Sequence, residues 1–462
     1  MRSLLCGLLV LAACGGSGPD GPFVVLSPSP EGAANQAQPL VRWGADGSLQ
    51  YRLRAYADEA ATQMIEEQLV RGTEARLSTG LADGQRVWVE VEGVQTGART
   101  PLSSFRVVLV PPTFPAMRVV RHDRARSTGG YKLFNILDIF PPAGEPRVGG
   151  IVLVNAAGEI VWVHLPADGG APSDARAYAD GTLTFFSRVA DATSMTSAGY
   201  EITWEGQVLW QTRPGALVHH ELGPGPGGGH LYMTYLAEEW DGVSYEGDGL
   251  ELVDPVSGDV IWTWSIFDHF HPADFQGIPE AEFQGLSRLG RDWSHANAAV
   301  WDPTRDLIWV SIRHFSRIIG VEYPSGDVRV TLGTDGLGGA AAMSYQHAPE
   351  VQADGSILFW DNGNHHVPRV SRARMVSFDE TTGAYEELFS WQDSPPFFDF
   401  AVGDADRMPN GNVLVTAGVS GRVIEVTLDG RIAWELALEG DRHWIYRCRQ
   451  VPEEWIPDWI VE

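Results

Sequence analysis

Short apolar runs alternate with polar positions over the first quarter of the chain. The five clearest runs are Phe23–Leu26, Leu40–Trp43, Tyr51–Tyr56, Val87–Val94 and Phe105–Val110. A period of two is typical of strands with one buried face, and turn residues such as Ala82-Asp83-Gly84 separate the runs. The pattern predicts an antiparallel β-sandwich of the immunoglobulin or fibronectin kind over residues 23–112.

A second pattern repeats along the rest of the chain: an apolar strand, a turn with glycine, and an alternating strand that often ends in Trp. It occurs six times, in Ile151–Trp162, Tyr200–Trp210, Leu250–Trp262, Ile318–Val330, Met375–Tyr385 and Val423–Trp434. The repeats are spaced roughly 50–70 residues apart, as expected for the four-stranded blades of a propeller. The sequence therefore predicts an all-β chain in which residues 116–462 form a six-bladed β-propeller. An array of β-sandwiches would contain the same strands, and the prolines of residues 111–115 predict a linker.

Asp-Gly and Asn-Gly turns followed by a new strand lie upstream of several hairpins, as in Tyr178–Leu183, Gln352–Ile357 and Met408–Val413. Counting back from such turns places three histidines at one repeated position, on the first strand of three blades. They are His220, His295 and His347. Equivalent blade positions surround the central axis, so we expect the three imidazoles to converge. His219 competes with His220, but alternation along the strand directs the two to opposite faces, and His220 is preferred.

Four motifs in the second half of the chain resemble the bacterial arylsulfate sulfotransferase family. They are Asp292–Asn297 (DWSHAN), Ser311–His314 (SIRH), Tyr345–His347 (YQH) and Phe359–Asn364 (FWDNGN). The resemblance implies a six-bladed propeller behind an N-terminal β domain. It also implies transfer of a sulfuryl group from an aryl sulfate donor to a phenol acceptor, by a ping-pong mechanism through a sulfated histidine, with no PAPS and no cofactor.

The resemblance carries over to individual positions. His347 matches the nucleophile, and His220, His295, Asn297 and Arg313 match the residues that hold the sulfuryl oxygens. The chemistry agrees, because a neutral imidazole is a competent nucleophile and an Arg side chain offers a permanent charge with five N–H donors. A protonated His220 or His295 could exchange a proton with the phenol, and the sequence leaves open which of them does so.

Other polar and aromatic residues near these motifs have weaker interpretations. Glu350 is a candidate to orient an imidazole, Thr416 is a candidate polar group from the last blade, and Asp361 and Asn362 are interpreted as turn formers. Three aromatic residues could stack on an aryl substrate but more often pack between blades: Trp293, Phe315 and Tyr345. Four histidines receive no role: His269, His271, His365 and His366.

Composition narrows the choice of partners. The chain has 462 residues, with 33 Lys and Arg against 60 Asp and Glu, a formal net charge of −27 and a pI near 4.8. Phosphate contacts require clustered cations, which this chain lacks, so we expect no nucleic-acid partner. Hydrophobic residues make up 44% of the chain, enough for a sizeable core.

The first residues predict export. Arg2 precedes the apolar run Leu4–Ala13, which has the length of a signal peptide, and the run ends before Cys14. We interpret residues 1–13 as a lipoprotein signal, Cys14 as the lipid attachment site, and residues 14–22 as a flexible tether. An ordinary secretory signal is the alternative. The prediction places the protein in the periplasm or at the cell surface, anchored to the outer membrane. The resemblance adds a homodimer as a candidate state.

Two other functions compete with sulfuryl transfer. A non-enzymatic propeller lipoprotein that binds a ligand or a protein would contain the same six repeats. It would not explain why His, Asn and Arg gather at inner positions. A metal site formed by His220, His295 and His347 is the third hypothesis, since three imidazoles with an open position are a known catalytic arrangement. The nearby Arg313 would repel a cation and argues against it.

Overall fold

The computed structural model describes residues 23–138, 149–190, 195–275 and 289–461. The predicted signal peptide, Cys14 and the tether lie outside these residues. The described residues form two compact units, the first ending at Val110 and the second beginning at Pro111. Their regular elements are almost all strands, with only short helices, which confirms the predicted all-β class. No helix in the described ranges is both long enough and apolar enough to span a membrane.

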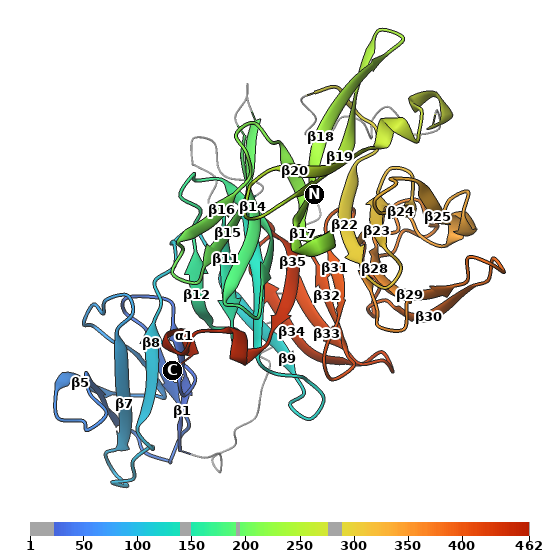
Figure 1. The fold of residues 1–462 in the computed structure, drawn as a ribbon. Helices are drawn as coiled ribbons and strands as arrows, with labels where there is room; N and C mark the ends of the chain where they lie inside the picture. The colour runs from blue at the N-terminus through green and yellow to red at the C-terminus, as the bar shows by residue number, and fades with distance from the viewer. Residues whose placement is uncertain (1–22, 139–148, 191–194, 276–288, 462) are drawn as a thin grey trace, which may run out of the picture. The chain divides into compact units, whose positions relative to one another are not determined.

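The first unit contains two sheets, in the strand orders β1-β3-β6 and β2-β8-β7-β4-β5 (Figure 1). The strands are β1 (Val25–Ser27), β2 (Gly32–Ala34), β3 (Leu40–Trp43), β4 (Tyr51–Tyr56), β5 (Met64–Val70), β6 (Glu74–Arg76), β7 (Arg86–Gly93) and β8 (Ser103–Val107). Each of the five predicted strands overlaps one of these. Trp43, Leu53 and Phe105 share one core between the sheets. Strand β5 escaped prediction because its sequence, MIEEQLV, has no fully buried face.

In the second unit, the described residues form six sheets with four or five strands each. Their orders are β12-β11-β10-β35, β13-β14-β15-β16, β17-β18-β19-β20 with β21 beside β19, β22-β23-β24-β25-β26, β27-β28-β29-β30, and β31-β32-β33-β34-β9. The strands of the first three sheets are β10 (Tyr131–Asp138), β11 (Gly150–Val154), β12 (Ile160–His164), β13 (Ala171–Ala177), β14 (Thr182–Ala190), β15 (Met195–Thr203), β16 (Val208–Gln211), β17 (Val218–Pro224), β18 (His230–Trp240), β19 (Val243–Val253), β20 (Val260–Ser265), β21 (Arg291–Asp292) and β35 (His443–Val451). Those of the other three are β9 (Met117–His122), β22 (Ala296–Asp302), β23 (Leu307–Ile312), β24 (Arg317–Glu322), β25 (Val328–Gly333), β26 (Leu337–Gly338), β27 (His347–Val351), β28 (Ile357–Asp361), β29 (Arg372–Phe378), β30 (Tyr385–Trp391), β31 (Asp404–Arg407), β32 (Val413–Ala417), β33 (Arg422–Val426) and β34 (Ile432–Leu438).

The six predicted hairpins are present, one in each of the six sheets: β11–β12, β15–β16, β19–β20, β24–β25, β29–β30 and β33–β34. Strands β11 and β12 make the first of them, and β33 and β34 make the last. Their turns contain glycines with positive φ, such as Gly158 at 82° and Gly430 at 83°. Only glycine adopts this backbone without steric cost, and this is why the glycine marked each hairpin in the sequence.

One edge strand of each sheet, called here its first strand, contacts the corresponding strand of the next sheet in succession; in the sheet of β10–β12 this edge strand is β35. Strand β13 contacts β35 and β17, β17 contacts β22, β22 contacts β27, β27 contacts β31, and β31 contacts β35. Strand β35 lies near the C-terminus and pairs with β10, so strands from both ends of the unit share one sheet. The functional site is built along this succession of first strands.

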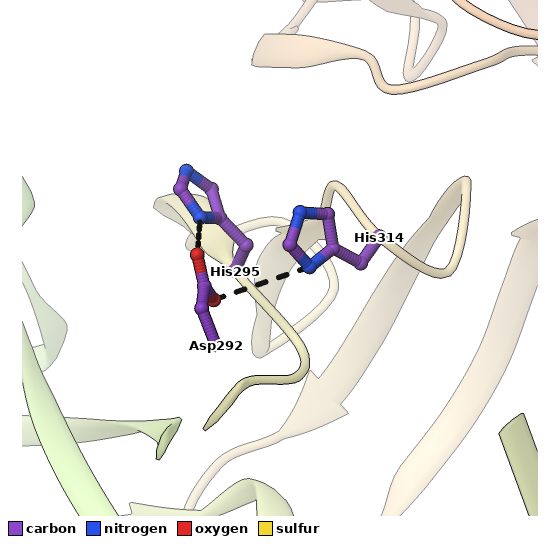
Figure 2. A group of neighbouring side chains, drawn as sticks. All are labelled: Asp292, His295 and His314. Carbon is purple, nitrogen blue, oxygen red and sulfur yellow. Dashed lines mark hydrogen bonds and ion pairs between the residues drawn. The ribbon is translucent and has the colours of Figure 1, made fainter. Parts of the chain in front are cut away.

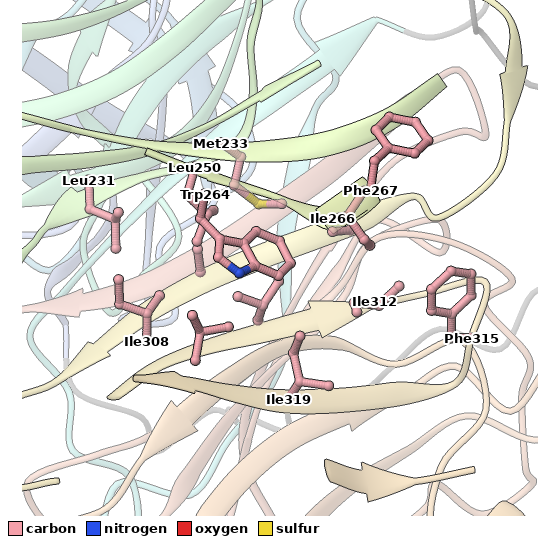
Figure 3. Packing of buried hydrophobic residues seen from close by; sticks show 14 of the residues in the cluster. Leu231, Met233, Leu250, Trp264, Ile266, Phe267, Ile308, Ile312, Phe315 and Ile319 are labelled. Carbon is pink, nitrogen blue, oxygen red and sulfur yellow. The ribbon is translucent and has the colours of Figure 1, made fainter. Parts of the chain in front are cut away.

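Neighbouring sheets pack face to face through apolar side chains. Figure 3 shows one such layer, where Leu231, Met233 and Trp264 of one sheet meet Ile308 and Ile319 of the next. Strands covered on both faces read as continuous apolar runs, as in Ile308–Val310. Because this packing fixes the sheets relative to one another, their first strands can position polar groups.

Candidate active site

The structure brings the predicted site residues together from three consecutive sheets. His220 lies on β17, His295 directly precedes β22, and His347 begins β27. The ring centroids of His220 and His295 are 5.1 Å apart. Arg313 and His347 both contact Tyr345, the first through its ring and the second through its carbonyl oxygen.

A repeated backbone irregularity presents these side chains. On β17, His219 pairs with Met233 and Leu222 with Tyr232, which leaves His220 and Glu221 in a β-bulge. His220 has a φ of 57° and His295 a φ of 49°, in the left-handed region that non-glycine residues rarely enter. Bulges re-aim side chains and are common beside active sites.

We predicted that His220, His295 and His347 occupy the same position in their blades, but His347 lies one residue earlier than His220 relative to its bulge. The left-handed residue of β27 is Ala348, with a φ of 48°, and His347 precedes it. His347 pairs with Trp360, just as His219 pairs with Met233 before the bulge of β17. Counting from the turns missed this offset because a two-residue bulge leaves no mark in the hydrophobic pattern.

His347 is held through its Nδ1 atom. That atom lies 2.6 Å from Oδ1 of Asn362 and 3.2 Å from the carbonyl oxygen of Tyr345. Asn362 in turn donates from Nδ2 to the carbonyls of Asp399 and Val402, at 2.8 and 3.0 Å. Burial, together with the charge of Arg313, lowers the pKa of His347 well below its usual range. The imidazole is therefore neutral at pH 7.

Asp292 joins two imidazoles, as Figure 2 shows. One carboxylate oxygen bonds Nδ1 of His295, and the other lies 3.9 Å from Nδ1 of His314. Burial alone would raise the pKa of Asp292, but His295, His314 and Arg313 outweigh it and lower the pKa to about 2. The carboxylate is ionised at neutral pH. Sequence analysis missed Asp292, although it lies three residues before His295 in the motif that carried the resemblance.

Asp292, His295 and His314 are also the group with the geometry to hold a metal ion, since one ligand atom from each lies within 4.8 Å of the others. This group differs from the predicted metal set of His220, His295 and His347. The positive charge of Arg313 acts on Asp292 and opposes a bound cation. The carboxylate of Asp292 already accepts a hydrogen bond from Nδ1 of His295, so the protein's own groups account for the arrangement.

His219 and His220 form a pair. Their Nδ1 atoms are 2.7 Å apart, and the ring of buried His219 stacks on Tyr235 with a centroid distance of 3.9 Å. Burial lowers the pKa of His219 to about 3 and that of His220 well below its usual range. Tyr446 of β35 donates its hydroxyl to the carbonyl of His220 at 3.0 Å. The structure thus places His220 beside His295 and packs His219 away in the core.

Arg313 lies in the turn between β23 and β24. Its Cζ atom sits 4.2 Å from the ring centroid of Tyr345, and Nη2 donates to the carbonyl of Phe400 at 3.1 Å. These two contacts orient the guanidinium, whose planar fork of N–H donors and permanent charge suit an anion.

Asn297 supports the chain beside His347. Its Nδ2 donates to the carbonyl of Gln346 at 2.8 Å, and its own carbonyl accepts from Nη2 of Arg447 at 2.7 Å. Arg447 lies on β35 and also contacts Asp174 and Glu221. Sequence analysis missed Arg447, because nothing in its local sequence shows that the last strand joins the first sheet.

The weaker interpretations have mixed outcomes. Within the part of the chain that the structure describes, Glu350 contacts no imidazole. Its carboxylate accepts from the backbone N–H of Arg407 and from Gln352, so the suggested orienting role is wrong. Trp293 packs on Phe267 and Phe315 inside the core. Asn362 is more than a turn former, since it bonds His347. Thr416 is buried on β32 and pairs with Asp404.

The four histidines without a role contact other groups. His366 bonds the carboxylate of Asp361 at 2.9 Å, and the ring of His365 lies 4.5 Å from that of Tyr345. His269 stacks on Trp264, and the ring of His271 lies 3.7 Å from that of Trp240. The exposed His365 is thus linked to Arg313 through the Tyr345 ring that both contact.

Solved structures provide only distant likenesses. A protein of unknown function from Bacteroides caccae is 14% identical, covering 68% of this chain and 97% of its own, with a TM-score of 0.42. A putative 6-phosphogluconolactonase from Bacteroides uniformis is 10% identical, covering 87% of this chain and 100% of its own, with a TM-score of 0.39. No curated protein matched the chain.

A family model gives a firmer result. The model of the arylsulfotransferases (ASST) matches residues 148–430, more than half of the chain. The matched segment includes His220, His295, Asn297, Arg313 and His347, the residues that the sequence motifs had singled out. The predicted resemblance is confirmed, and the chain belongs to the arylsulfotransferase family.

Proposed function

We propose that this protein transfers a sulfuryl group from a phenolic sulfate ester to a phenolic acceptor without PAPS, by a ping-pong mechanism through sulfated His347. The observation that carries the proposal is the environment of His347. Its imidazole is buried, neutral, fixed through Nδ1, and within reach of the charge of Arg313. Family membership supports a sulfotransferase in general.

The reaction has two half-steps. A ring nitrogen of His347 attacks sulfur, an N–S bond forms, and the S–O bond breaks with its electron pair on the departing phenolate, which takes up a proton. In the second half-step the acceptor phenol loses its proton, its oxygen attacks sulfur, and the N–S bond breaks. As in phosphoryl transfer, catalysis here consists of positioning and of stabilising charge on the equatorial oxygens. Arg313 and His220 are the donors we assign to those oxygens, and such donors typically contribute about 10²–10³ each in rate.

The finer architecture belongs to the same proposal. Six sheets whose first strands contact in succession, with one sheet shared between strands from both ends of the unit, support a six-bladed propeller for residues 116–462. Two sheets around one core support a sandwich for residues 23–112. We further propose an exported lipoprotein anchored through Cys14, with a homodimer as its candidate state, because the first residues have the signal pattern and the family resemblance includes both export and dimers.

Transfer can be tested with 4-nitrophenyl sulfate as donor and phenol as acceptor, following the release of nitrophenolate. We expect turnover by the wild-type chain, none by His347→Asn, and near-normal turnover by His366→Asn, a control that removes an imidazole bonded to Asp361 instead. Incubation with donor alone should add one SO₃ to the intact chain, mapped to His347. If varied donors give neither turnover nor adduct, the non-enzymatic binding propeller becomes the better hypothesis.

A further inference from the structure

The three imidazoles of the site differ in what their Nδ1 atoms contact. His347 faces the amide oxygen of Asn362, His295 faces the carboxylate of Asp292, and His220 faces the imidazole of His219. We propose that these partners divide the work of sulfuryl transfer: Asn362 fixes His347 as a neutral nucleophile acting through Nε2, and Asp292 makes His295 the residue that handles the proton. This rests on the proposed function and specifies its mechanism.

The side-chain amide of Asn362 is oriented by its own hydrogen bonds. Its Nδ2 donates to the carbonyls of Asp399 and Val402, so Oδ1 is the atom that faces His347. Oδ1 and the carbonyl of Tyr345 can only accept hydrogen bonds, so Nδ1 of His347 must carry the hydrogen. A neutral imidazole with its proton on Nδ1 has its lone pair on Nε2. Among the described residues, no hydrogen bond engages Nε2, and that lone pair is available to attack sulfur.

Asp292 acts on His295 through its negative charge. The carboxylate can only accept, so Nδ1 of His295 carries a hydrogen as well, but here the partner is an anion. An anion stabilises the imidazolium that forms when Nε2 also takes a proton, as the buried carboxylate of a catalytic triad does. Burial lowers the pKa of the other imidazole beside Asp292, that of His314, to about 3, so His314 does not compete for this charge. Arg313 also faces Asp292, and its positive charge weakens the stabilisation without replacing the hydrogen bond. His220 and His347 face His295 as well, but both imidazoles are neutral and add no opposing charge.

His220 lacks such support. Its Nδ1 atom meets Nδ1 of His219, and a hydrogen bond between two Nδ1 atoms holds a single proton. Buried His219 stays neutral, since its pKa falls to about 3. No carboxylate bonds the His220 ring among the described residues. His220 therefore remains neutral and is assigned to binding, which settles the choice between His220 and His295 that the sequence left open.

The proton balance of the reaction follows. As Nε2 of His347 bonds sulfur and the S–O bond breaks, the departing phenolate oxygen takes a proton from Nε2 of His295. In the second half-step the acceptor phenol returns a proton to Nε2 of His295, while its oxygen bonds sulfur and the N–S bond breaks. Asp292 touches neither substrate and acts as a positioning residue through His295. General acid catalysis of this kind contributes about 10²–10⁴ in rate.

The first test uses Asp292→Asn, in which Oδ1 can still accept from Nδ1 of His295 but the negative charge is gone. The activity compared is the first half-step alone, the release of phenol from the donor without acceptor, because the second half-step needs His295 whichever donor is used. A good leaving group needs no acid, so this activity with 4-nitrophenyl sulfate should fall less than about tenfold. With unsubstituted phenyl sulfate, whose phenolate is a poorer leaving group, it should fall about 10²–10³-fold. The control is Asp302→Asn, a buried carboxylate paired with Arg305 outside the site, which should leave the ratio of the two activities unchanged. An equal loss with both donors would overturn the role of Asp292.

The second test needs no catalysis. In wild-type protein labelled with ¹⁵N histidine, long-range ¹H–¹⁵N spectra report which ring nitrogen bears the proton. We expect neutral His347 with its proton on Nδ1, and a proton on Nδ1 of His295, where it bonds Asp292. His347 with its proton on Nε2 would overturn the assignment of the nucleophilic atom. This readout does not depend on turnover. An inactive wild-type chain would therefore refute the proposed function, whereas the spectra would still test the assigned tautomers.

Discussion

Arg447 provides a stringent test of the polar interior beside the site. Its Nη1 lies 2.8 Å from Oδ1 of Asp174 and 2.7 Å from Oε2 of Glu221, and all three side chains are at most 2% exposed. Removing one partner of a buried ion pair typically costs 3–5 kcal/mol, because the remaining charge stays in a medium that solvates it poorly. Arg176 and Arg449 still contact Asp174, so we expect the lower end of that range, about 3 kcal/mol, for Arg447→Met.

The assay is urea unfolding of the full chain followed by Trp fluorescence. Arg431→Met is the matched control: this Arg also pairs with an aspartate, Asp429, but both side chains are more than half exposed. An exposed pair contributes about 0–1 kcal/mol, and the control should change the free energy of unfolding by no more than that. Adding Glu221→Gln to Arg447→Met should recover about 1 kcal/mol or more, since the two positions are directly coupled.

The destabilisation by Arg447→Met should depend on pH in a defined direction. Burial opposes ionisation of Asp174, yet Arg176, Arg447 and Arg449 hold its pKa below the usual value near 4. The stabilisation from a carboxylate with a lowered pKa is present above about pH 4 and is lost as the pH falls toward the folded-state pKa. The gap between wild type and Arg447→Met should therefore be largest at pH 7 and shrink below about pH 4. If Arg447→Met costs no more than Arg431→Met at pH 7, the reasoning is refuted.

Three further predictions concern the site. Asp248 accepts from the backbone N–H of Ala296 at 2.7 Å, next to His295. Burial raises the pKa of Asp248 to about 7, so the stabilisation from its protonated form is fully present below about pH 4 and is lost as the pH rises through 7. Asp248→Asn should remove this loss, about 3 kcal/mol between pH 5 and pH 8 by urea unfolding, and an unchanged pH slope would contradict this. Arg313→Lys keeps the charge but not the planar fork, so kcat/KM for sulfuryl transfer should fall about 10²–10³-fold with an unchanged unfolding midpoint, whereas near-normal kcat/KM would remove Arg313 from the site. Dialysis against EDTA should leave the transfer rate intact, because Asp292 already accepts a hydrogen bond from His295 and the charge of Arg313 opposes a cation. A loss restored by one added metal would instead favour a metal at Asp292, His295 and His314.

The sequence determined the strand class and the repeat because both are local properties. Glycine turns with positive φ and alternating or continuous apolar runs depend only on neighbouring residues, and all six predicted hairpins are present. The motifs around His295 and His347 likewise identified the family, since residue types at fixed spacing survive without knowledge of the fold.

Only the tertiary structure decided which groups support the site. Asp292 and Asn362 were visible in the motifs, but their contacts with His295 and His347 depend on bulges and turns that change side-chain direction without changing the hydrophobic pattern. Arg447 meets Asn297 because β35 joins the sheet begun by β10, about 300 residues earlier in the chain. Pairing between distant segments depends on the packing of whole sheets, and its free energy cannot be read from any single stretch of sequence. For this reason the sequence identified the imidazoles, whereas the groups that set their protonation were visible only in the structure.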